Sequence, residues 1–259
     1  MIFQVLGCGT STGVPVPGCR CPVCTSPDPR NRRNRTSGLI RLDDGRSILI
    51  DASTDLRHQA LAWGVERVDA VLFTHTHADH ILGVEDLRCF NWTTGNSIPC
   101  YGSAPTLTEI RRFFRYIFEP DPDYQGGALA RLTLHQITEL TPFTAAGLEV
   151  LPFGLDHGRT RVTGFRIGEL AYATDCNSIP TPSREALRGV RYLILDALRM
   201  DPPHRTHFTI PEAIAVAREI GAERTVFVHM THSIDFESVS RDLPPGIELA
   251  VDGLTLEFS

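Results

Sequence analysis

The sequence lacks the features that mark membrane-spanning, secreted or disordered proteins. No stretch of its 259 residues approaches the roughly 18 uninterrupted apolar residues that cross a bilayer. Residues 1–7 contain no basic segment ahead of a long apolar one, so we expect no signal peptide and a cytoplasmic protein. No low-complexity linker, repeat or long charge block divides the chain, which predicts one domain over residues 1–259. A net charge of −6 disfavours nucleic acid as a partner.

The apolar pattern predicts alternating strands and helices, with 42% apolar and 22% charged residues providing an ordinary globular core. Strands dominate the early part of each half of the chain, which favours an α/β layered sandwich over a doubly wound sheet. We expect helices at 54–63, 106–118 and 210–220, and a Pro/Gly-rich excursion at 119–127. The expected strands are 2–6, 38–42, 47–51, 68–74, 132–138, 147–153, 162–168, 169–174, 191–196 and 225–229, with two more within 246–258.

Histidine and aspartate are concentrated in one short segment. Residues 74–80 read THTHADH and place four candidate metal ligands directly after an apolar run. A strand end followed by a helix start can direct His75 and His77 to one metal ion and Asp79 and His80 to a second. Imidazole and carboxylate ligands suit zinc, manganese or iron. The alternative is a set of surface histidines in a loop.

A second cluster consists of cysteines. Cys19, Cys21 and Cys24 lie within six residues, and close thiols in a reducing compartment indicate metal binding rather than disulfide bonds. Three thiolates need a fourth ligand to complete a tetrahedral structural zinc site. His232 is a candidate for that ligand, because it follows His229 by three residues and a loop can direct the two imidazoles to separate sites. Free buried thiols are the alternative, and the other four cysteines are interpreted as packing residues.

The His-x-His-x-Asp-His motif after an apolar strand resembles the metallo-β-lactamase superfamily. That resemblance implies a single-domain αββα sandwich with a binuclear metal site at its edge. The family's later ligands match His157, Asp175 and His229, each of which follows an apolar strand. Asp51 matches a family aspartate that supports the site without contacting the metal ions. The match divides the ligands between two ions that share Asp175: His75, His77 and His157 for one, and Asp79, His80 and His229 for the other.

The cysteine cluster is similar to one branch of that superfamily, which contains the cyclic-phosphate phosphodiesterase of the bacterial carbon–phosphorus lyase pathway. This branch has a Cys-x-Cys-x-x-Cys zinc site completed by a late histidine. It also has a histidine that is not a ligand and serves the leaving group. His207 is the better match for that histidine and His204 the weaker, because Thr209 resembles the N-cap of a following helix. The alternative for His207 is a surface histidine beside that helix.

These features together predict a metal-dependent phosphodiesterase. Two divalent ions, manganese or zinc, would provide a bridging hydroxide for in-line attack on phosphorus. His207 would protonate the leaving oxygen, and Asp79 is counted with it as catalytic. The expected substrate and partner is a small phosphodiester, specifically a phosphoribosyl 1,2-cyclic phosphate. The resemblance implies a homodimer, and residues 106–135 are interpreted as a substrate-shaping insertion.

Three other functions remain open. A tRNA 3′-end processing endonuclease has the same ligand set, but the chain is acidic and shows no basic, glycine-rich arm. A thioester or lactam hydrolase would share the metal ions, although the expected lack of a signal peptide disfavours a periplasmic lactamase. The third alternative is a non-catalytic metal-binding protein with the same fold.

Overall fold

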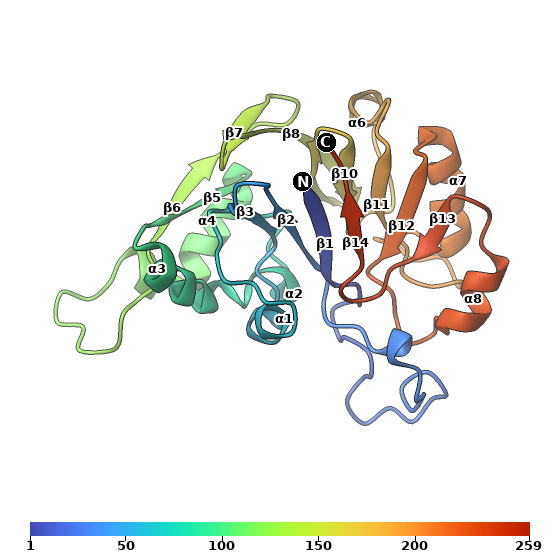
Figure 1. Cartoon of the computed structure of the whole chain (residues 1–259), viewed down its shortest axis with the longest axis horizontal. Helices are drawn as coiled ribbons and strands as arrows, with labels where there is room; N and C mark the ends of the chain where they lie inside the picture. The colour runs from blue at the N-terminus through green and yellow to red at the C-terminus, as the bar shows by residue number, and fades with distance from the viewer.

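Two seven-stranded β-sheets packed face to face form the centre of the computed structural model, which describes all residues from 1 to 259 (Figure 1). In the first sheet, the strands from β14 to β3 pair antiparallel, and those from β3 to β6 pair parallel. The spatial order of this sheet is β14 (Thr255–Glu257), β1 (Ile2–Gly7), β2 (Ser37–Arg41), β3 (Ser47–Ile50), β4 (Ala70–Leu72), β5 (Ile98–Gly102) and β6 (Leu132–Gln136).

The second sheet mirrors this arrangement, with parallel pairing from β10 to β13 and antiparallel pairing from β7 to β10. Its spatial order is β13 (Ile247–Leu249), β12 (Arg224–Val228), β11 (Tyr192–Asp196), β10 (Leu170–Ala173), β9 (Thr160–Ile167), β8 (Leu148–His157) and β7 (Phe143–Ala145).

Helices flank the two sheets (Figure 1). Beside the first sheet lie α1 (Leu56–Ala62), α2 (Ala78–Ile81), α3 (Arg88–Thr94), α4 (Ala104–Phe113) and α5 (Arg115–Phe118). Beside the second sheet lie α6 (Thr181–Ala186), α7 (Ile210–Ile220) and α8 (Phe236–Asp242). Two 3₁₀ turns, η1 (Pro29–Asn31) and η2 (Val84–Leu87), interrupt the loops. No helix has the length and apolar character needed to cross a membrane.

The strands divide their side chains between two apolar clusters. Ile40 and Ile48 belong to the cluster of 44 buried residues that joins the two sheets. Their neighbours Leu39 and Leu49 belong to a cluster of 19 residues between the first sheet and its helices. Successive strand side chains point to opposite faces, so a strand covered on both faces reads as a continuous apolar run. The predicted α/β sandwich is therefore confirmed.

The predicted site residues lie at one edge of the sandwich, where strands end. Strands β3, β4, β10, β11 and β12 end at the same edge of the sandwich. The predicted site histidines and aspartates lie at these ends or in the loops that follow, and His157 ends β8. The chain ends lie side by side at the opposite edge, where the Met1 amine donates to the Phe258 carbonyl oxygen at 3.0 Å.

The structure differs from the expected elements mainly in the helices. The helix expected at 106–118 begins at Ala104 and is broken at Phe114, whose φ of −110° and ψ of 38° are not helical. Helix α3 was not predicted, because its sequence RCFNWTT contains few strong helix formers and no side-chain cap. The burial of Phe90 and Asn91 in the tertiary structure determines its conformation instead.

Candidate metal centre

Unusual backbone conformations occur at three residues of the predicted site. Asp51, Asp175 and His229 have φ values of 61°, 55° and 62°, in the left-handed region that residues with a Cβ rarely adopt. Each follows the end of a strand, β3, β10 or β12. Such conformations persist where the surrounding structure enforces them, and they cluster at functional sites.

Asp51 holds the histidine loop in place. One carboxylate oxygen accepts a hydrogen bond from the Thr74 backbone N–H at 2.8 Å, and the other accepts from the Thr74 hydroxyl at 2.8 Å. The second oxygen also lies 2.7 Å from Nδ1 of His80. This contact leaves Nε2 of His80 directed into the site, which is how a supporting carboxylate orients a metal-binding imidazole. Asp51 therefore lies where the sequence placed it, behind the site.

The structure brings all seven predicted metal ligands together. One group places a nitrogen or oxygen of His75, His77, His157 and Asp175 within 4.8 Å of one another. In a second group, the ligand atoms of Asp79, His80 and His229 also lie within 4.8 Å of one another.

Asp175 lies between these groups. Its Oδ1 is 3.3 Å from His80 Nε2, and its Oδ2 is 3.3 Å from His229 Nε2 and 3.7 Å from His75 Nε2. The carboxylate is therefore placed to contact both ions of a pair.

The donor atoms fit divalent cations. Nε2 of His75, His80 and His229 and Oδ2 of Asp79 are buried and have no hydrogen-bond partner. Buried polar atoms without partners are rare and destabilise a fold, so four in one cavity indicate a missing ligand. Burial lowers the pKa of His75 well below its usual range, whereas in His80 the Asp175 and Asp51 carboxylates outweigh burial and raise the pKa well above that range. Two divalent ions would satisfy these atoms.

His207 also reaches the site, whereas His204 does not. The His207 ring stacks on the His229 ring with a centroid distance of 4.7 Å. Nδ1 of His207 lies 3.2 Å from both carboxylate oxygens of Asp196. Burial opposes the charged form, but the neighbouring Asp196 outweighs it and raises the pKa of His207 to about 9. His204 is exposed and contacts the Thr206 hydroxyl at 3.1 Å.

Asp196 is a residue that sequence reasoning missed. It ends β11, is completely buried and accepts a hydrogen bond from the Phe208 backbone N–H at 3.1 Å in addition to contacting His207. A signal was present, because Asp51 and Asp175 are also aspartates at the ends of apolar strands.

The cysteine cluster forms a separate group, in the loop that projects below the sandwich in Figure 1. The sulfurs of Cys19, Cys21 and Cys24 lie 3.3, 3.4 and 3.5 Å from Nδ1 of His232. This convergence on one nitrogen provides the Cys₃His donor set that suits zinc. The packing interpretation of the other cysteines is wrong for Cys89, which is exposed.

A pocket of about 390 Å³ opens over the two ligand groups. It has no hydrophobic lining residue. Apart from the predicted site residues, Ser11, Arg159, Thr160 and Thr206 line it. Such a surface suits a small, charged and hydrophilic ligand.

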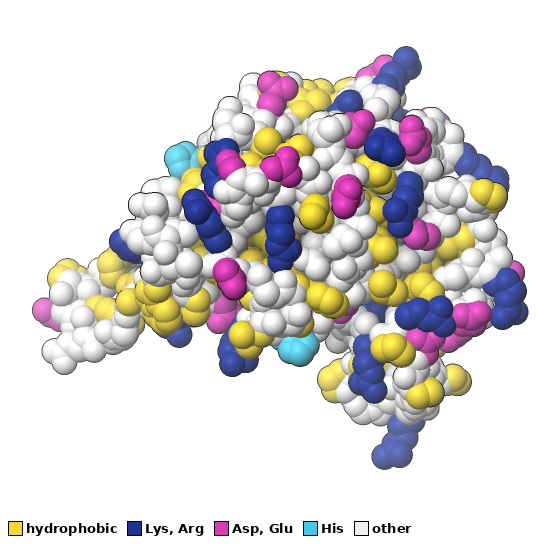
Figure 2. Space-filling view, viewed as in Figure 1, with side chains coloured by type: hydrophobic (Ala, Val, Ile, Leu, Met, Phe, Trp, Pro, Cys, Tyr) yellow, Lys and Arg dark blue, Asp and Glu magenta, His cyan; other side chains and the backbone are white.

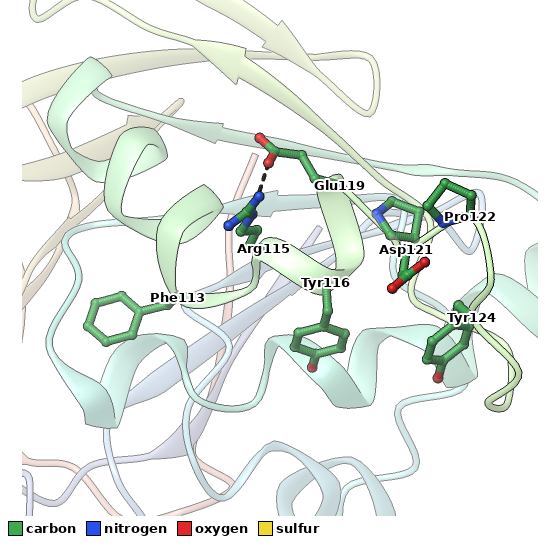
Figure 3. A pocket seen from close by; sticks show the side chains of 8 residues that line it. Phe113, Arg115, Tyr116, Glu119, Asp121, Pro122 and Tyr124 are labelled. Atoms are coloured by element: carbon green, nitrogen blue, oxygen red, sulfur yellow. Dashed lines mark hydrogen bonds and ion pairs between the residues drawn. The ribbon is translucent and has the colours of Figure 1, made fainter.

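A larger hollow, of about 720 Å³, lies elsewhere (Figure 3). It is lined by α5 and the exposed loop that follows, including Tyr116, Glu119 and Tyr124. Figure 2 shows apolar side chains gathered where this loop joins the body of the molecule. The hollow contains none of the predicted metal ligands, so the substrate-shaping role of residues 106–135 stays a prediction.

A family model described as the beta-lactamase superfamily domain matches residues 46–230. The chain belongs to the metallo-β-lactamase superfamily. A crystal structure described as a new diphosphatase from the PhnP family has 41% identity and a TM-score of 0.91 with this chain, covering 100% of it and 98% of the diphosphatase. The superfamily resemblance, its PhnP-like branch and the prediction of a metal-dependent hydrolase are therefore confirmed.

Two curated relatives carry other names. An octanoyltransferase of Porphyromonas gingivalis (strain ATCC BAA-308 / W83) is 40% identical over 251 residues, which cover 96% of this chain and 50% of that protein. The chain thus spans about half the length of this relative. A ribonuclease Z of Mycobacterium sp. (strain KMS) is 27% identical over 232 residues, covering 79% of this chain and 80% of the relative.

Proposed function

We propose that the protein is a binuclear phosphodiesterase that hydrolyses a small anionic phosphodiester, such as a cyclic sugar phosphate. One observation carries this proposal. Asp175 lies between two groups of candidate metal ligands, four buried atoms of these groups lack hydrogen-bond partners, and a small pocket lined only by polar residues opens over them. The PhnP-family name of a similar diphosphatase supports phosphate ester chemistry.

His75, His77 and His157 would hold one ion, and Asp79, His80 and His229 the other, with Asp175 between them. When bound, zinc or manganese ions supply a hydroxide at neutral pH and positive charge that neutralises a phosphate. The protein's own contribution is to orient these ligands, as Asp51 does for His80. Cys19, Cys21, Cys24 and His232 would hold a third ion, a zinc with a structural role.

His207 is placed to donate a proton to the leaving oxygen. Asp196 contacts Nδ1, and the ring lines the pocket, so Nε2 is the atom available to a substrate. Water would add its oxygen to phosphorus and release a proton to solvent, one P–O bond would break, and the departing oxygen would take the proton of His207. Solvent would then return a proton to the imidazole. General acid catalysis of this kind contributes roughly 100- to 10,000-fold to the rate.

A tRNA 3′-end endonuclease is the second candidate, supported by the similarity to ribonuclease Z. The net charge of −6 and the small pocket favour a small substrate instead. RNA binding at several salt concentrations separates the two. A steep loss of affinity with salt would indicate phosphate-backbone binding and favour the nuclease.

The deciding experiment combines metal analysis with turnover of bis(p-nitrophenyl) phosphate, with and without added manganese. We expect about three metal ions per chain and turnover, two ions from the shared site and one from the cysteine cluster. Cys24→Ser is the matched variant, which should lose about one ion and retain turnover. About one zinc ion per chain and no turnover with any metal would overturn the proposal.

A further inference from the structure

Arg33 is a charged residue that the fold buries almost completely, with 2% of its surface exposed. It lies in the arginine-rich run 30–35, where Arg32 is exposed and Arg35 pairs with Asp55 at 2.8 Å. The Arg33 side chain has no carboxylate partner and donates only to uncharged oxygens. A buried charge destabilises a protein unless it is well hydrogen-bonded, so the partners of Arg33 indicate what this residue stabilises.

The Arg33 guanidinium holds the segment that follows β12. Its Nη1 donates to the Thr231 carbonyl oxygen at 3.0 Å, and its Nη2 donates to the Ile234 carbonyl oxygen at 2.8 Å. Nη2 also donates to Oδ1 of Asn31 at 3.1 Å. The Arg33 backbone is itself fixed by two hydrogen bonds with the Val14 backbone, both at 2.8 Å. Arg33 therefore joins the loop before β2 to the segment after β12.

His229 lacks the side-chain hydrogen bond that orients the other buried candidate ligand histidines. Nδ1 of His229 has no hydrogen-bond partner and lies 3.7 Å from Oδ1 of Asp196. The orientation of this ring therefore depends on its backbone, which has a φ of 62°. In the other three, Nδ1 lies 2.7 to 2.9 Å from a hydroxyl, carboxylate or carbonyl oxygen: Thr74 for His75, Asp51 for His80 and Thr206 for His157.

Arg33 contacts the chain directly after His229. Thr231 follows His229 by two residues, and the two carbonyl groups that Arg33 binds lie on either side of His232 in the sequence. A left-handed backbone at a residue with a Cβ persists where the surrounding structure enforces it. Arg33 supplies such a constraint from a position 198 residues before Thr231.

We propose that Arg33 is a positioning residue that fixes His229 for metal binding, acting through the Thr231 and Ile234 carbonyl groups. This inference rests on the proposed two-ion site, since it concerns the ion that His229 would hold. The guanidinium, rather than a zinc ion at the cysteine cluster, then holds the segment in place. Supporting contacts around a metal site typically contribute about 10- to 100-fold to metal affinity.

Manganese titration after chelation of the shared site, measured by calorimetry, tests this inference without turnover. Manganese is a poor match for thiolates, so it reports on the shared site rather than on the cysteine cluster. Arg33→Met should raise the dissociation constant of one of the two manganese ions by about 10- to 100-fold and change the other by less than about twofold. Arg33→Lys keeps a charge and a donor and should retain part of the affinity. Arg32→Met is the matched control, because Arg32 is exposed, and it should change neither constant.

Two further variants show how Arg33 acts. Cys24→Ser should lose zinc from the cysteine cluster and keep both manganese dissociation constants within about twofold of wild type. The double variant Arg33→Met with His229→Ala should bind manganese no more weakly than His229→Ala alone, because Arg33 acts through that imidazole.

A folded Arg33→Met protein with a lower Tm but unchanged manganese constants would overturn the inference, since Arg33 would then only stabilise the fold. Equal weakening of both ions, or a loss in Cys24→Ser as large as that in Arg33→Met, would overturn it as well. If Arg33→Met does not fold, unchanged constants in a folded Arg33→Lys protein would do the same. Wild-type protein that binds no pair of manganese ions would instead refute the proposed function, so the two failures are distinguishable.

Discussion

Asp196 acts through His207 and does not itself reach the substrate pocket. It is buried beneath the imidazole and contacts Nδ1, so its charge and position determine which ring nitrogen faces the pocket. An asparagine has the same shape but would present an N–H group to Nδ1 or lose the Phe208 contact. Asp196 is thus a positioning residue.

Replacement of these two residues tests the general-acid role. We expect His207→Ala to lower kcat by roughly 100- to 10,000-fold and Asp196→Asn to lower it by a smaller factor, because the variant imidazole remains but is misdirected. Metal content, measured on the same samples, should equal that of wild type. Loss of metal ions from His207→Ala would contradict the assignment, since His207 would then be a ligand.

Asp252 couples stability to pH at a distance from the metal ligands. Its carboxylate accepts hydrogen bonds from the Cys8 and Asn34 backbone N–H groups at 3.0 and 2.7 Å, and burial raises its pKa to about 6. The folded state binds this proton more tightly than the unfolded state does. The free energy of unfolding therefore falls as the pH rises from about 4 to about 6, by about 3 kcal/mol for this group.

Denaturant unfolding at pH 4.5 and pH 7 measures this effect. Asp252→Asn should remove the fall in stability across that range. The matched variant is Asp121→Asn, an exposed carboxyl with no hydrogen bond to a buried group, and it should preserve the wild-type slope. If the free energy of unfolding fell equally with pH in wild type and in Asp252→Asn, a group other than Asp252 would be responsible.

At the scale of elements, the loop after α5 stands apart from the rest of the fold. Residues 119–128 are exposed throughout, and their hollow shares no residue with the metal site (Figure 3). We expect a Gly/Ser sequence of equal length in place of residues 121–126 to change kcat/KM for bis(p-nitrophenyl) phosphate by less than about twofold. Circular dichroism should show an unchanged fold. A large rise in KM would instead place the loop in the path of the substrate.

Elements with a strong local pattern could be predicted, and those determined by packing could not. Helix α7 begins at Ile210, directly after the predicted N-cap Thr209, whose hydroxyl and Glu212 form a reciprocal cap. The break at Phe114 has no such local signal, because its aromatic side chain is buried against distant strands and helices. Tertiary contacts therefore override local preference in the segment where the sequence analysis was least successful.

For the whole molecule, the fold could be predicted from one motif and the family it resembles, and the candidate ligands that the resemblance implies lie close together in the structure. Thr74 to His80 indicated the family, and His157, Asp175 and His229 were then matched to the family's later ligands. The left-handed backbone of Asp175 and the contact between Asp196 and His207, which lies 11 residues further along the chain, depend on how the strand ends and loops pack. No periodicity or motif in the sequence encodes these two features.

Because residues 1 and 259 lie close together and away from the candidate metal site, the order of the strands along the chain can be changed without moving the site residues. Strand β1 carries the chain about 20 Å from Met1 toward the site edge, at about 3.3 Å for each of its residues. A short peptide can join Met1 to Ser259 there, and new ends can be opened in the exposed loop after α5. Such a circular permutant would retain every candidate ligand, and a protein tethered at residue 1 or residue 259 would leave the pocket open.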